Sequence, residues 1–376
     1  MKSPQAATEP SAFEEAKTIA HALDFEVALA HGCAASGLIT TAHAAAIESA
    51  RQKLDLDPDE TMEAARHAGT LAIAIVDRLR AAADAELRGA GKSVHLGATS
   101  QDLADTVLVL QMRHAAETLD HLANGISGHL AQLAKRHIST TMIGRTLLQQ
   151  ATPITFGLKA ANWMLGVDDA ATRLRREIGD ACVLQFGGAS GTLATLGVDS
   201  KSVAEHLSQN LGLPLPTMPW HSRRGNIAGV AAAIAILGGA NAKIADDIAL
   251  LAQNEVSEAT EPVQRGRGGS SAMAHKQNPV GCQQALTALA TVPALAGTLM
   301  SGLGHQHERG LWGWQAERST LVQLFTQCKI ALAALTPVLA GLVVDAPRMA
   351  ENLKTSGRGN DIGHAADFVR RALGIL

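Results

Sequence analysis

One glycine-rich segment carries the residue types that proton exchange at a carbon atom would need. Residues 266–282 read GRGGSSAMAHKQNPVGC, and the glycines at the start predict a loop rather than a helix. Ser270 precedes Lys276 and Asn278, so this loop could bring a hydroxyl, a cation and an amide to one reacting carbon while excluding water. A solvated Gly/Ser linker is the alternative. A phosphate-binding loop is disfavoured because the G-x-x-x-x-G-K-[ST] spacing is absent.

Long helices are the elements that would position this loop. Aromatic residues make up 3% of the chain and tyrosine is absent, a composition that favours helix over strand. Proline is missing from residues 59–152 and 220–261, which leaves room for very long helices, although glycines around residue 90 mark a break in the first stretch. We expect an N-terminal helical domain at 1–94, a central long-helix domain at 95–342 and a short C-terminal region at 343–376.

Apolar residues recur at alternating steps of three and four over residues 226–255, which is a heptad pattern. The seam positions are Ile227, Val230, Ile234, Leu237, Ile244, Ile248 and Leu251, with Asn241 in the same register. Such a helix would be roughly 45 Å long and unstable on its own. We therefore expect the seam to form the core of an oligomer. A weaker seam runs through residues 119–133.

The bulk composition disfavours several classes of function. The net charge is −3 and neither half is strongly basic, so no nucleic-acid partner is expected. The four cysteines lack C-x-x-C spacing, which disfavours a disulfide framework or a zinc site and favours the cytoplasm. The first residues lack the apolar core of an export signal. Residues 277–307 are uncharged, but prolines and polar residues interrupt them, so we expect a helix buried on most sides and no membrane partner.

Three blocks of the chain resemble the fumarase/aspartase/adenylosuccinate lyase superfamily. The loop at 266–282 is similar to its signature G-S-S-x-M-P-x-K-x-N. Residues 95–106, HLGATSQDLADT, are similar to H-x-G-x-T-S-x-D-x-x-D-T, and residues 144–157, GRTLLQQATPITFG, to R-T-x-x-Q-x-A-x-P-x-T-F-G. With the segments at 185–197 and 304–318 the resemblance covers nearly the whole chain. Within the superfamily, the runs GRTLLQQA, PWH and HKQNPVGC most resemble its muconate-cyclising branch.

The resemblance implies an all-α fold of the fumarase/aspartase type, with a shortened C-terminal region. Its long central helices would form a tetrameric bundle, and active sites would be shared between subunits. It implies that Ser270 exchanges a proton with carbon, and that Lys276 and Asn278 stabilise charge on the neighbouring carboxylate. The residues expected to bind substrate are His95, Thr99, Ser100, Gln101, Gln149, Arg309 and Arg318, of which the arginines suit bidentate carboxylate pairing.

Two departures from the lyase pattern concern acid–base chemistry. Leu147 stands where the lyases carry a histidine, and Gln283 stands where they carry a glutamate. A positioned acid is typically worth about 10²–10⁴-fold when a nitrogen must be protonated as it leaves. A carboxylate, with a pKa of about 4, leaves as a stable anion. Loss of both residues therefore favours lactone formation, in which a carboxylate of the substrate adds to its own diene and Ser270 protonates the α carbon.

The sequence is also compatible with other interpretations. A lyase that releases fumarate, such as adenylosuccinate lyase, is the rival enzyme, and a non-catalytic helical scaffold is the rival from another class. His275 is an alternative acid. His305, His307 and Glu308 could be taken for a metal site, but they lack a second ligand cluster and the H-E-x-x-H spacing. We expect a cytoplasmic isomerase acting on a small tricarboxylate in aromatic-compound breakdown, without metal or organic cofactor.

Overall fold

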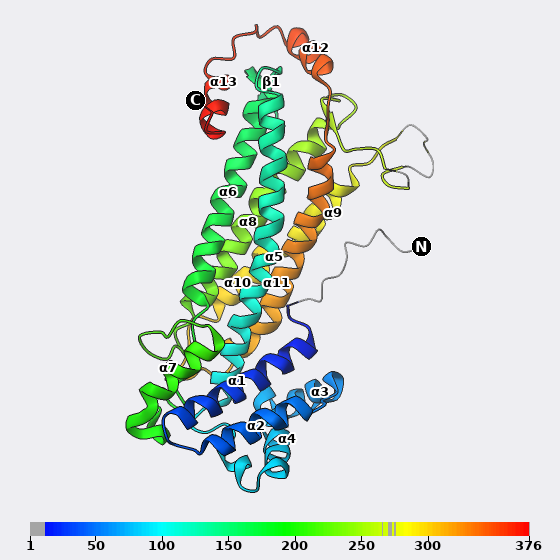
Figure 1. Cartoon of the computed structure of the whole chain (residues 1–376). Coiled ribbons are helices and arrows are strands. Elements are labelled where there is room, and N and C mark those ends of the chain that lie inside the picture. The colour runs from blue at the N-terminus through cyan, green and yellow to red at the C-terminus, as the bar shows by residue number, and fades with distance from the viewer. Residues whose placement is uncertain (1–11, 265, 270–272, 274–275, 376) are drawn as a thin grey trace. The chain divides into compact units, whose positions relative to one another are not determined.

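The computed structural model describes residues 12–264, 266–269, 273 and 276–375, and nearly all of its elements are helices. The long helices are α5 (Ser100–Arg136), α6 (Phe156–Ala181), α8 (Gly225–Leu251) and α11 (Gly313–Ala340) (Figure 1). The shorter ones are α1 (Glu15–Ala35), α2 (Thr41–Lys53), α3 (Pro58–Ala68), α4 (Leu71–Glu86), η1 (Ala90–Ser93), η2 (Ala194–Asp199), α7 (Ser200–Leu211), α9 (Val280–Leu289), α10 (Val292–Ser301), α12 (Ala346–Ser356) and α13 (Ala365–Ala372). The predicted all-α class is confirmed.

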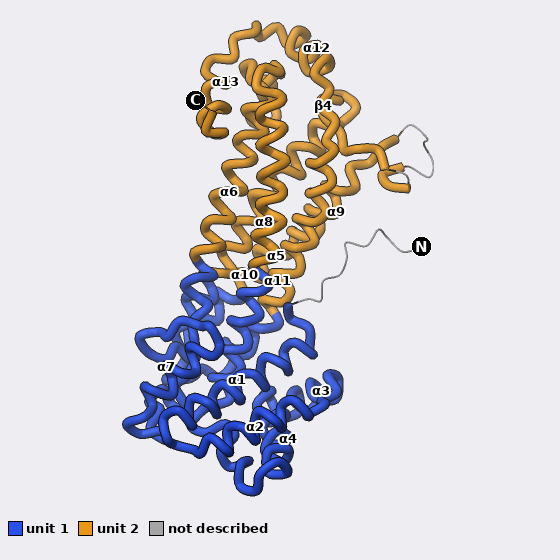
Figure 2. The backbone as a smooth tube through the Cα atoms, viewed as in Figure 1, with its two compact units in different colours: residues 1–116, 177–229, 299–319 blue, residues 117–176, 230–298, 320–376 orange. Residues whose placement is uncertain are grey.

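The chain divides into two compact units, each assembled from separated stretches of sequence (Figure 2). The first unit comprises residues 1–116, 177–229 and 299–319, and the second comprises residues 117–176, 230–298 and 320–376. Helices α5, α6, α8, α10 and α11 each contribute residues to both units. The three consecutive regions expected from the sequence stay a prediction.

Short capped helices build much of the first unit. The Thr40 hydroxyl accepts a hydrogen bond from the third residue of α2, and the Asp57 carboxylate does the same for α3, whose first residue is Pro58. The glycine-marked break before α5 is confirmed: the Asp84 carboxylate accepts hydrogen bonds from the backbone N–H groups of Gly89 (3.0 Å) and Gly91 (2.8 Å). A side chain at Gly91 would meet the carbonyl oxygen of Arg80 at 2.6 Å, so the turn requires glycine there.

The heptad seam of α8 is buried by the chain itself. Every seam position from Ile227 to Leu251 is buried, including Asn241, whose amide donates to the carbonyl of Leu237 at 2.8 Å. The helix ends within a few residues of its predicted end. The prediction that this seam forms an oligomer core is therefore wrong, because the heptad face points into the chain's own interior. A heptad pattern records burial but does not tell whether the partner helix belongs to the same chain.

A β-hairpin interrupts the helices where none was expected. Strands β1 (Thr141–Thr146) and β2 (Gln149–Thr155) pair in antiparallel fashion, and a second small sheet joins β3 (Ala259–Thr260) to β4 (Val343–Val344). The hairpin turn places Leu147 and Leu148 at φ 51° and 62°, a left-handed conformation normally taken by Asn or Gly. Arg145 on β1 donates to both carboxylate oxygens of the fully buried Glu258 at 2.7 and 2.8 Å, which ties the hairpin to the residue that precedes β3.

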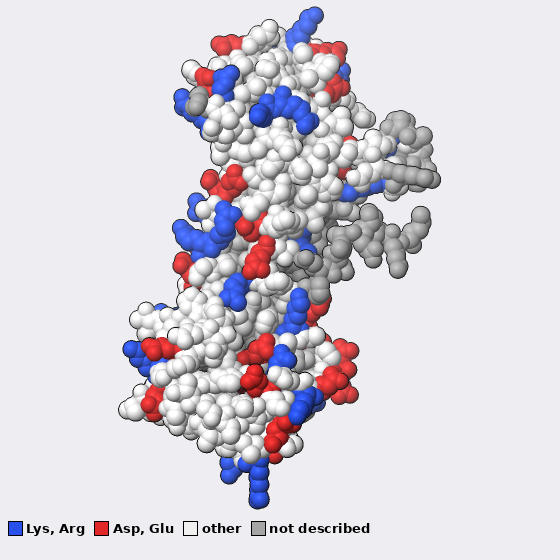
Figure 3. Space-filling view, in the orientation of Figure 1, with Lys and Arg blue, Asp and Glu red and all other residues white. Residues whose placement is uncertain are grey.

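Within the described residues, three helical stretches are long and apolar enough to cross a membrane by length and composition, namely Gly225–Leu251, Val280–Ser301 and Gly313–Ala340. The second of these corrects the expectation for residues 277–307, because only 33% of its apolar window is buried inside the chain. The exposed side of α9 and α10 carries small and uncharged polar residues such as Gln283, Thr287 and Thr298. Broad uncharged areas are also visible on the face of the second unit in Figure 3.

Gly157 and Gly166 provide a matched test of packing in α6. A β-carbon at Gly157 would lie 2.7 Å from the carbonyl oxygen of His137 and 2.8 Å from that of Ala134, whereas nothing lies within 4 Å at Gly166. We expect Gly157→Ala to lower the free energy of unfolding by about 1–3 kcal/mol through overpacking. Gly166→Ala should raise it by about 0.5–1 kcal/mol through helix propensity. Urea unfolding measures both, and equal effects would contradict the packing argument.

Candidate active site

A cavity of about 740 Å³ opens in the first unit, in the region of the α5 N-terminus. Three stretches supply its wall: the end of α3 and start of α4, the first turn of α5, and the segment that leads into α11. The lining residues are Gly69, Thr70, Ser100, Gln101, Gln306, His307, Arg309, Gly310, Leu311, Trp312, Trp314 and Gln315. Indole rings and a guanidinium thus share one wall with hydroxyl and amide groups, a mixture typical of small-molecule sites.

The first turn of α5 and Arg309 form a corner suited to a carboxylate. Thr99 precedes the helix, and the Arg309 guanidinium donates a hydrogen bond to its hydroxyl oxygen. Ser100 lines the cavity beside them. The first N–H groups of a helix have no partner within the helix, and its positive dipole end lies there. The predicted grouping of Thr99, Ser100 and Arg309 therefore forms, and it combines a cation with hydroxyl and backbone donors.

Gln101 lies at this corner, but its amide nitrogen is already committed. Nε2 donates to the Asp105 carboxylate at 3.2 Å and to the carbonyl oxygen of His221 at 3.0 Å. The side chain is buried, and its Oε1 has no hydrogen-bond partner among the residues described. The expectation that this side-chain amide donates to a substrate carboxylate is therefore not supported by the geometry. Gln101 can still offer its backbone N–H.

His95 and Arg318 contact α1, and neither lines the cavity among the described residues. His95 Nδ1 lies 2.6 Å from a carboxylate oxygen of Glu26. Burial lowers the pKa of His95, but the hydrogen bond and the charge of Glu26 outweigh it, so the pKa is raised overall. Arg318 donates to the Thr18 hydroxyl at 2.8 Å, and burial lowers its pKa. In both cases the contact ties another segment of the chain to α1.

The other predicted site residues belong to the second unit or lie outside the described residues. Ser270 and His275 are outside them. Lys276 is exposed, as is Gln149 on β2 beside the Leu147 turn. Asn278 closes the base of the glycine-rich loop, because its backbone N–H and its Nδ2 both donate to the carbonyl oxygen of Gly268, at 2.7 and 3.1 Å.

The start of α9 is held directly after this loop. The Glu261 carboxylate accepts hydrogen bonds from the N–H groups of Gly281 (3.0 Å) and Cys282 (2.7 Å). A carboxylate at a helix N-terminus satisfies donors that have no partner within the helix. The C-terminal end of the segment that carries Lys276 and Asn278 is therefore anchored to a fixed helix end.

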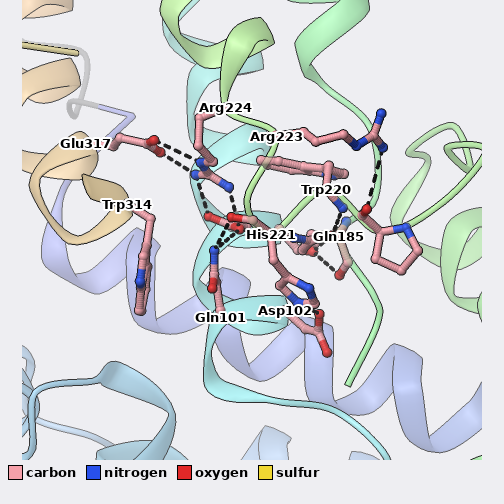
Figure 4. A network of polar contacts seen from close by, with 12 residues as sticks. Gln101, Asp102, Gln185, Trp220, His221, Arg223, Arg224, Trp314 and Glu317 are labelled. Carbon is pink, nitrogen blue, oxygen red and sulfur yellow. Dashed lines mark hydrogen bonds and ion pairs between the residues drawn. The ribbon is translucent and has the colours of Figure 1, made fainter. Parts of the chain in front are cut away.

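A buried ionic network, which sequence reasoning missed, lies next to the cavity. Arg224 donates to both oxygens of Asp105, at 2.7 and 2.8 Å, and to Glu317 at 2.8 Å. Its guanidinium also stacks on the Trp220 ring, 4.6 Å from the centroid. Figure 4 shows Arg224 reaching toward Glu317 beside this ring. Burial raises the pKa of Glu317, and Arg224 opposes that rise. The D-L-A-D spacing in 95–106 was the available signal, because it places two carboxylates on one helical face.

The His305 ring packs against the segment that forms part of the cavity wall. A β-carbon at Gly313 would lie 2.6 Å from its Nε2, and one at Gly310 would lie 2.8 Å from its Nδ1, so both glycines are needed for the wall to pass the ring. Burial lowers the pKa of His305, and the nearby charge of Arg224 lowers it further. The ring therefore favours its neutral form. Trp314 ties the same segment together by donating to the carbonyl oxygen of Gly310 at 2.9 Å.

Known proteins resemble this chain over most of its length. The family model described as Lyase matches residues 6–293. The 3-carboxy-cis,cis-muconate cycloisomerase of Bradyrhizobium diazoefficiens is 46% identical, over 91% of this chain and 76% of that protein. The enzyme of the same name from Pseudomonas aeruginosa is 43% identical, over 88% of this chain and 72% of that protein. The crystal structure of the 3-carboxy-cis,cis-muconate lactonizing enzyme from Pseudomonas putida matches with a TM-score of 0.89 at 33% identity, covering 96% of this chain and 95% of that one.

Proposed function

This chain belongs to the lyase family, and from that premise we propose that it cyclises 3-carboxy-cis,cis-muconate to 4-carboxymuconolactone. The observation that carries the proposal is the corner formed by Arg309, Thr99 and Ser100, which suits a carboxylate. It occurs in a chain 46% identical to an enzyme named for this substrate. The reaction would belong to the protocatechuate branch of aromatic breakdown, the beta-ketoadipate pathway.

The chemistry requires one new C–O bond and one proton. A carboxylate oxygen of the substrate adds to a carbon of the diene, and the electron pair moves to the carbon α to another carboxylate. Ser270 would give that carbon a proton, and its hydroxyl would then take up another proton from solvent. The substrate anion thus gains one proton overall, and the fully protonated substrate and product are isomers. Lys276 and Asn278 would stabilise the charge that builds on the adjoining carboxylate, usually the largest contribution in such catalysis. Because the ring closes within one molecule, the site mainly has to hold the diene acid in a reactive shape.

The departures from the lyase pattern agree with this chemistry. Leu147 is 96% exposed at the hairpin turn, and Gln283 is exposed in the first turn of α9. Neither side chain is an acid or base in the working pH range. In the reverse reaction the leaving group is a carboxylate that needs no proton. The histidine and glutamate of the lyases would therefore have no task here.

Assembly and location form part of the same proposal. We infer a cytoplasmic homotetramer with no nucleic-acid or membrane partner. The exposed side of α9 and α10 supports self-association, because it lacks Asp, Glu, Lys and Arg over a long helical stretch. A second copy of the chain can cover such a face without burying unpaired charge. Sedimentation velocity of the purified protein would measure the assembly.

A direct assay tests the proposed activity. The purified protein is mixed with 3-carboxy-cis,cis-muconate, the loss of diene absorbance is followed, and the product is identified by NMR. Formation of the lactone supports the proposal. Release of fumarate from adenylosuccinate would instead support the rival lyase, and turnover confined to another 3-substituted muconate would reassign the substrate. A folded oligomer that is inert towards every muconate would support a scaffold.

Arg309 offers a test of substrate binding. We expect Arg309→Met to raise KM for the muconate by about 10–100-fold, because a charge-assisted hydrogen bond is lost, while kcat changes much less. Arg358→Met is the control, since Arg358 is an exposed arginine that does not line the cavity. Steady-state kinetics of both variants decide the point. An unchanged KM in the Arg309 variant would remove this arginine from the site.

A further inference from the structure

The buried carboxylate of Asp102 holds several chain segments together near the start of α5. Asp102 is fully buried and accepts hydrogen bonds from the backbone N–H groups of Thr99 (3.0 Å), Gly187 (2.9 Å) and Gly188 (2.8 Å). A fourth hydrogen bond joins its Oδ1 to Nε2 of His221 at 2.7 Å. Three segments that are distant in sequence therefore meet at a single carboxylate, whose lone pairs are all occupied.

Glycines allow these segments to come so close. A β-carbon at Gly187 would meet Pro219 at 2.6 Å and the His221 ring at 2.8 Å. A β-carbon at Gly188 would meet the carbonyl oxygen of Gly97 at 2.9 Å, and Gly188 and Gly97 have φ values of 69° and 75°. The close approach of the 187–188 segment to the 97–99 turn therefore depends on glycine at these positions.

His221 completes the arrangement from the far side. Its side chain is 3% exposed, and its backbone carbonyl accepts the hydrogen bond from Gln101. Figure 4 shows the ring directed at Asp102. An Asp–His pair has the composition of a catalytic dyad, but neither residue lines the cavity among the described residues. The pair can therefore act on a bound molecule through the segments it holds, and of these the 99–101 turn is the one that contributes cavity-lining residues.

We propose that Asp102 and His221 are positioning residues that set the carboxylate-binding turn at 99–101, an inference that rests on the proposed function. The Asp102 carboxylate fixes the N–H of Thr99, and so orients the hydroxyl that meets Arg309 at the cavity corner. His221 donates its Nε2 proton to Oδ1 and thereby keeps the carboxylate in this orientation. When His221 cannot donate, the turn loses its fixed geometry and the grip on the substrate carboxylate weakens.

Two amide substitutions of different reach test this role. Glutamine can place its Nε2 where the imidazole Nε2 lies, whereas asparagine carries the same group on a side chain too short to reach Oδ1. We expect His221→Gln to keep KM within about threefold of the wild type, and His221→Asn to raise KM by about tenfold or more with kcat changed much less. Hydrogen exchange of the Thr99, Gly187 and Gly188 amides should accelerate in the asparagine variant only. Ile126→Ala, which empties a buried site in the second unit, controls for general loss of stability.

The outcomes separate this inference from the proposed function. Equal KM values for the two variants, or faster amide exchange in neither, would overturn the positioning role. A fall in kcat without a rise in KM would overturn it as well. If the wild type turns over no muconate, the proposed function fails. The positioning role is then decided by exchange and by the Kd of tricarballylate, a saturated tricarboxylate, measured by calorimetry. Weaker tricarballylate binding in the asparagine variant alone would support the role, and an equal Kd would reject it.

Discussion

Replacement of Ser270 by alanine is expected to lower kcat by about 10²–10⁴-fold while KM stays within about threefold of the wild type. The hydroxyl would be the group that passes a proton to carbon in lactone formation and takes it in reverse. Its removal leaves carboxylate binding by the 99–101 turn and Arg309 in place, so the loss should fall on the chemical step. Steady-state kinetics with 3-carboxy-cis,cis-muconate in the forward direction, and with the lactone in the reverse direction, measures kcat and KM.

Ser271 supplies a matched control for Ser270, because it is the next residue of the same loop and carries the same hydroxyl. We expect Ser271→Ala to retain activity within a few-fold. If both variants keep their activity, the proton comes from another group. The alternatives are then His275, which lies in the same loop of the sequence, and His307, whose imidazole lies on the cavity wall. The large fall in kcat would instead appear in His275→Asn or in His307→Asn.

Periodicity and composition predicted the helices because burial leaves a direct mark on sequence. In α8 the three-four spacing matched the buried face residue by residue. The two proline-free stretches contain α5 and α8, whereas α6 lies outside them and α11 contains Pro337. The hairpin at 141–155 was missed because its turn is Leu147–Leu148, which carries none of the Asn-Gly chemistry that marks such turns. What holds that hairpin in place is a distant pair, Arg145 with Glu258, and no local pattern reveals a partner so far along the chain.

The candidate site likewise contains some residues that the structure brings together as expected and others whose contacts were not expected. The expected roles of Thr99, Ser100 and Arg309 came from the resemblance to the superfamily, and the structure brings Arg309 to Thr99 although the two are far apart in sequence. The assignments of His95 and Arg318 as substrate contacts depended on which way a side chain points. Their actual partners, Glu26 and Thr18, are contributed by α1. The Asp102–His221 pair escaped notice for a related reason, since a carboxylate in a motif can serve backbone N–H groups as readily as a ligand.

Arg224→Met is expected to be strongly destabilising, lowering the free energy of unfolding by about 3–5 kcal/mol at pH 8. Arg224 is 1% exposed and is the shared partner of Asp105 and Glu317, which are themselves buried. Its removal leaves two carboxylates in a dry environment without their cation. Arg175→Met is the control, because Arg175 and Asp120 form an exposed pair. Such pairs contribute at most about 1 kcal/mol.

The same variant predicts how the loss of stability depends on pH. Burial raises the pKa of Glu317 in the folded protein, and Arg224 opposes the rise, so removal of Arg224 should raise this pKa further. An acid whose folded pKa lies above its unfolded value of about 4.3 binds more protons folded than unfolded, and stability then falls as pH rises through that window. The cost of Arg224→Met should therefore be largest at pH 8 and smaller near pH 5, where Glu317 can become protonated. Urea unfolding of variant and wild type at both pH values measures it, and a cost independent of pH would mean that Glu317 stays ionised without its partner.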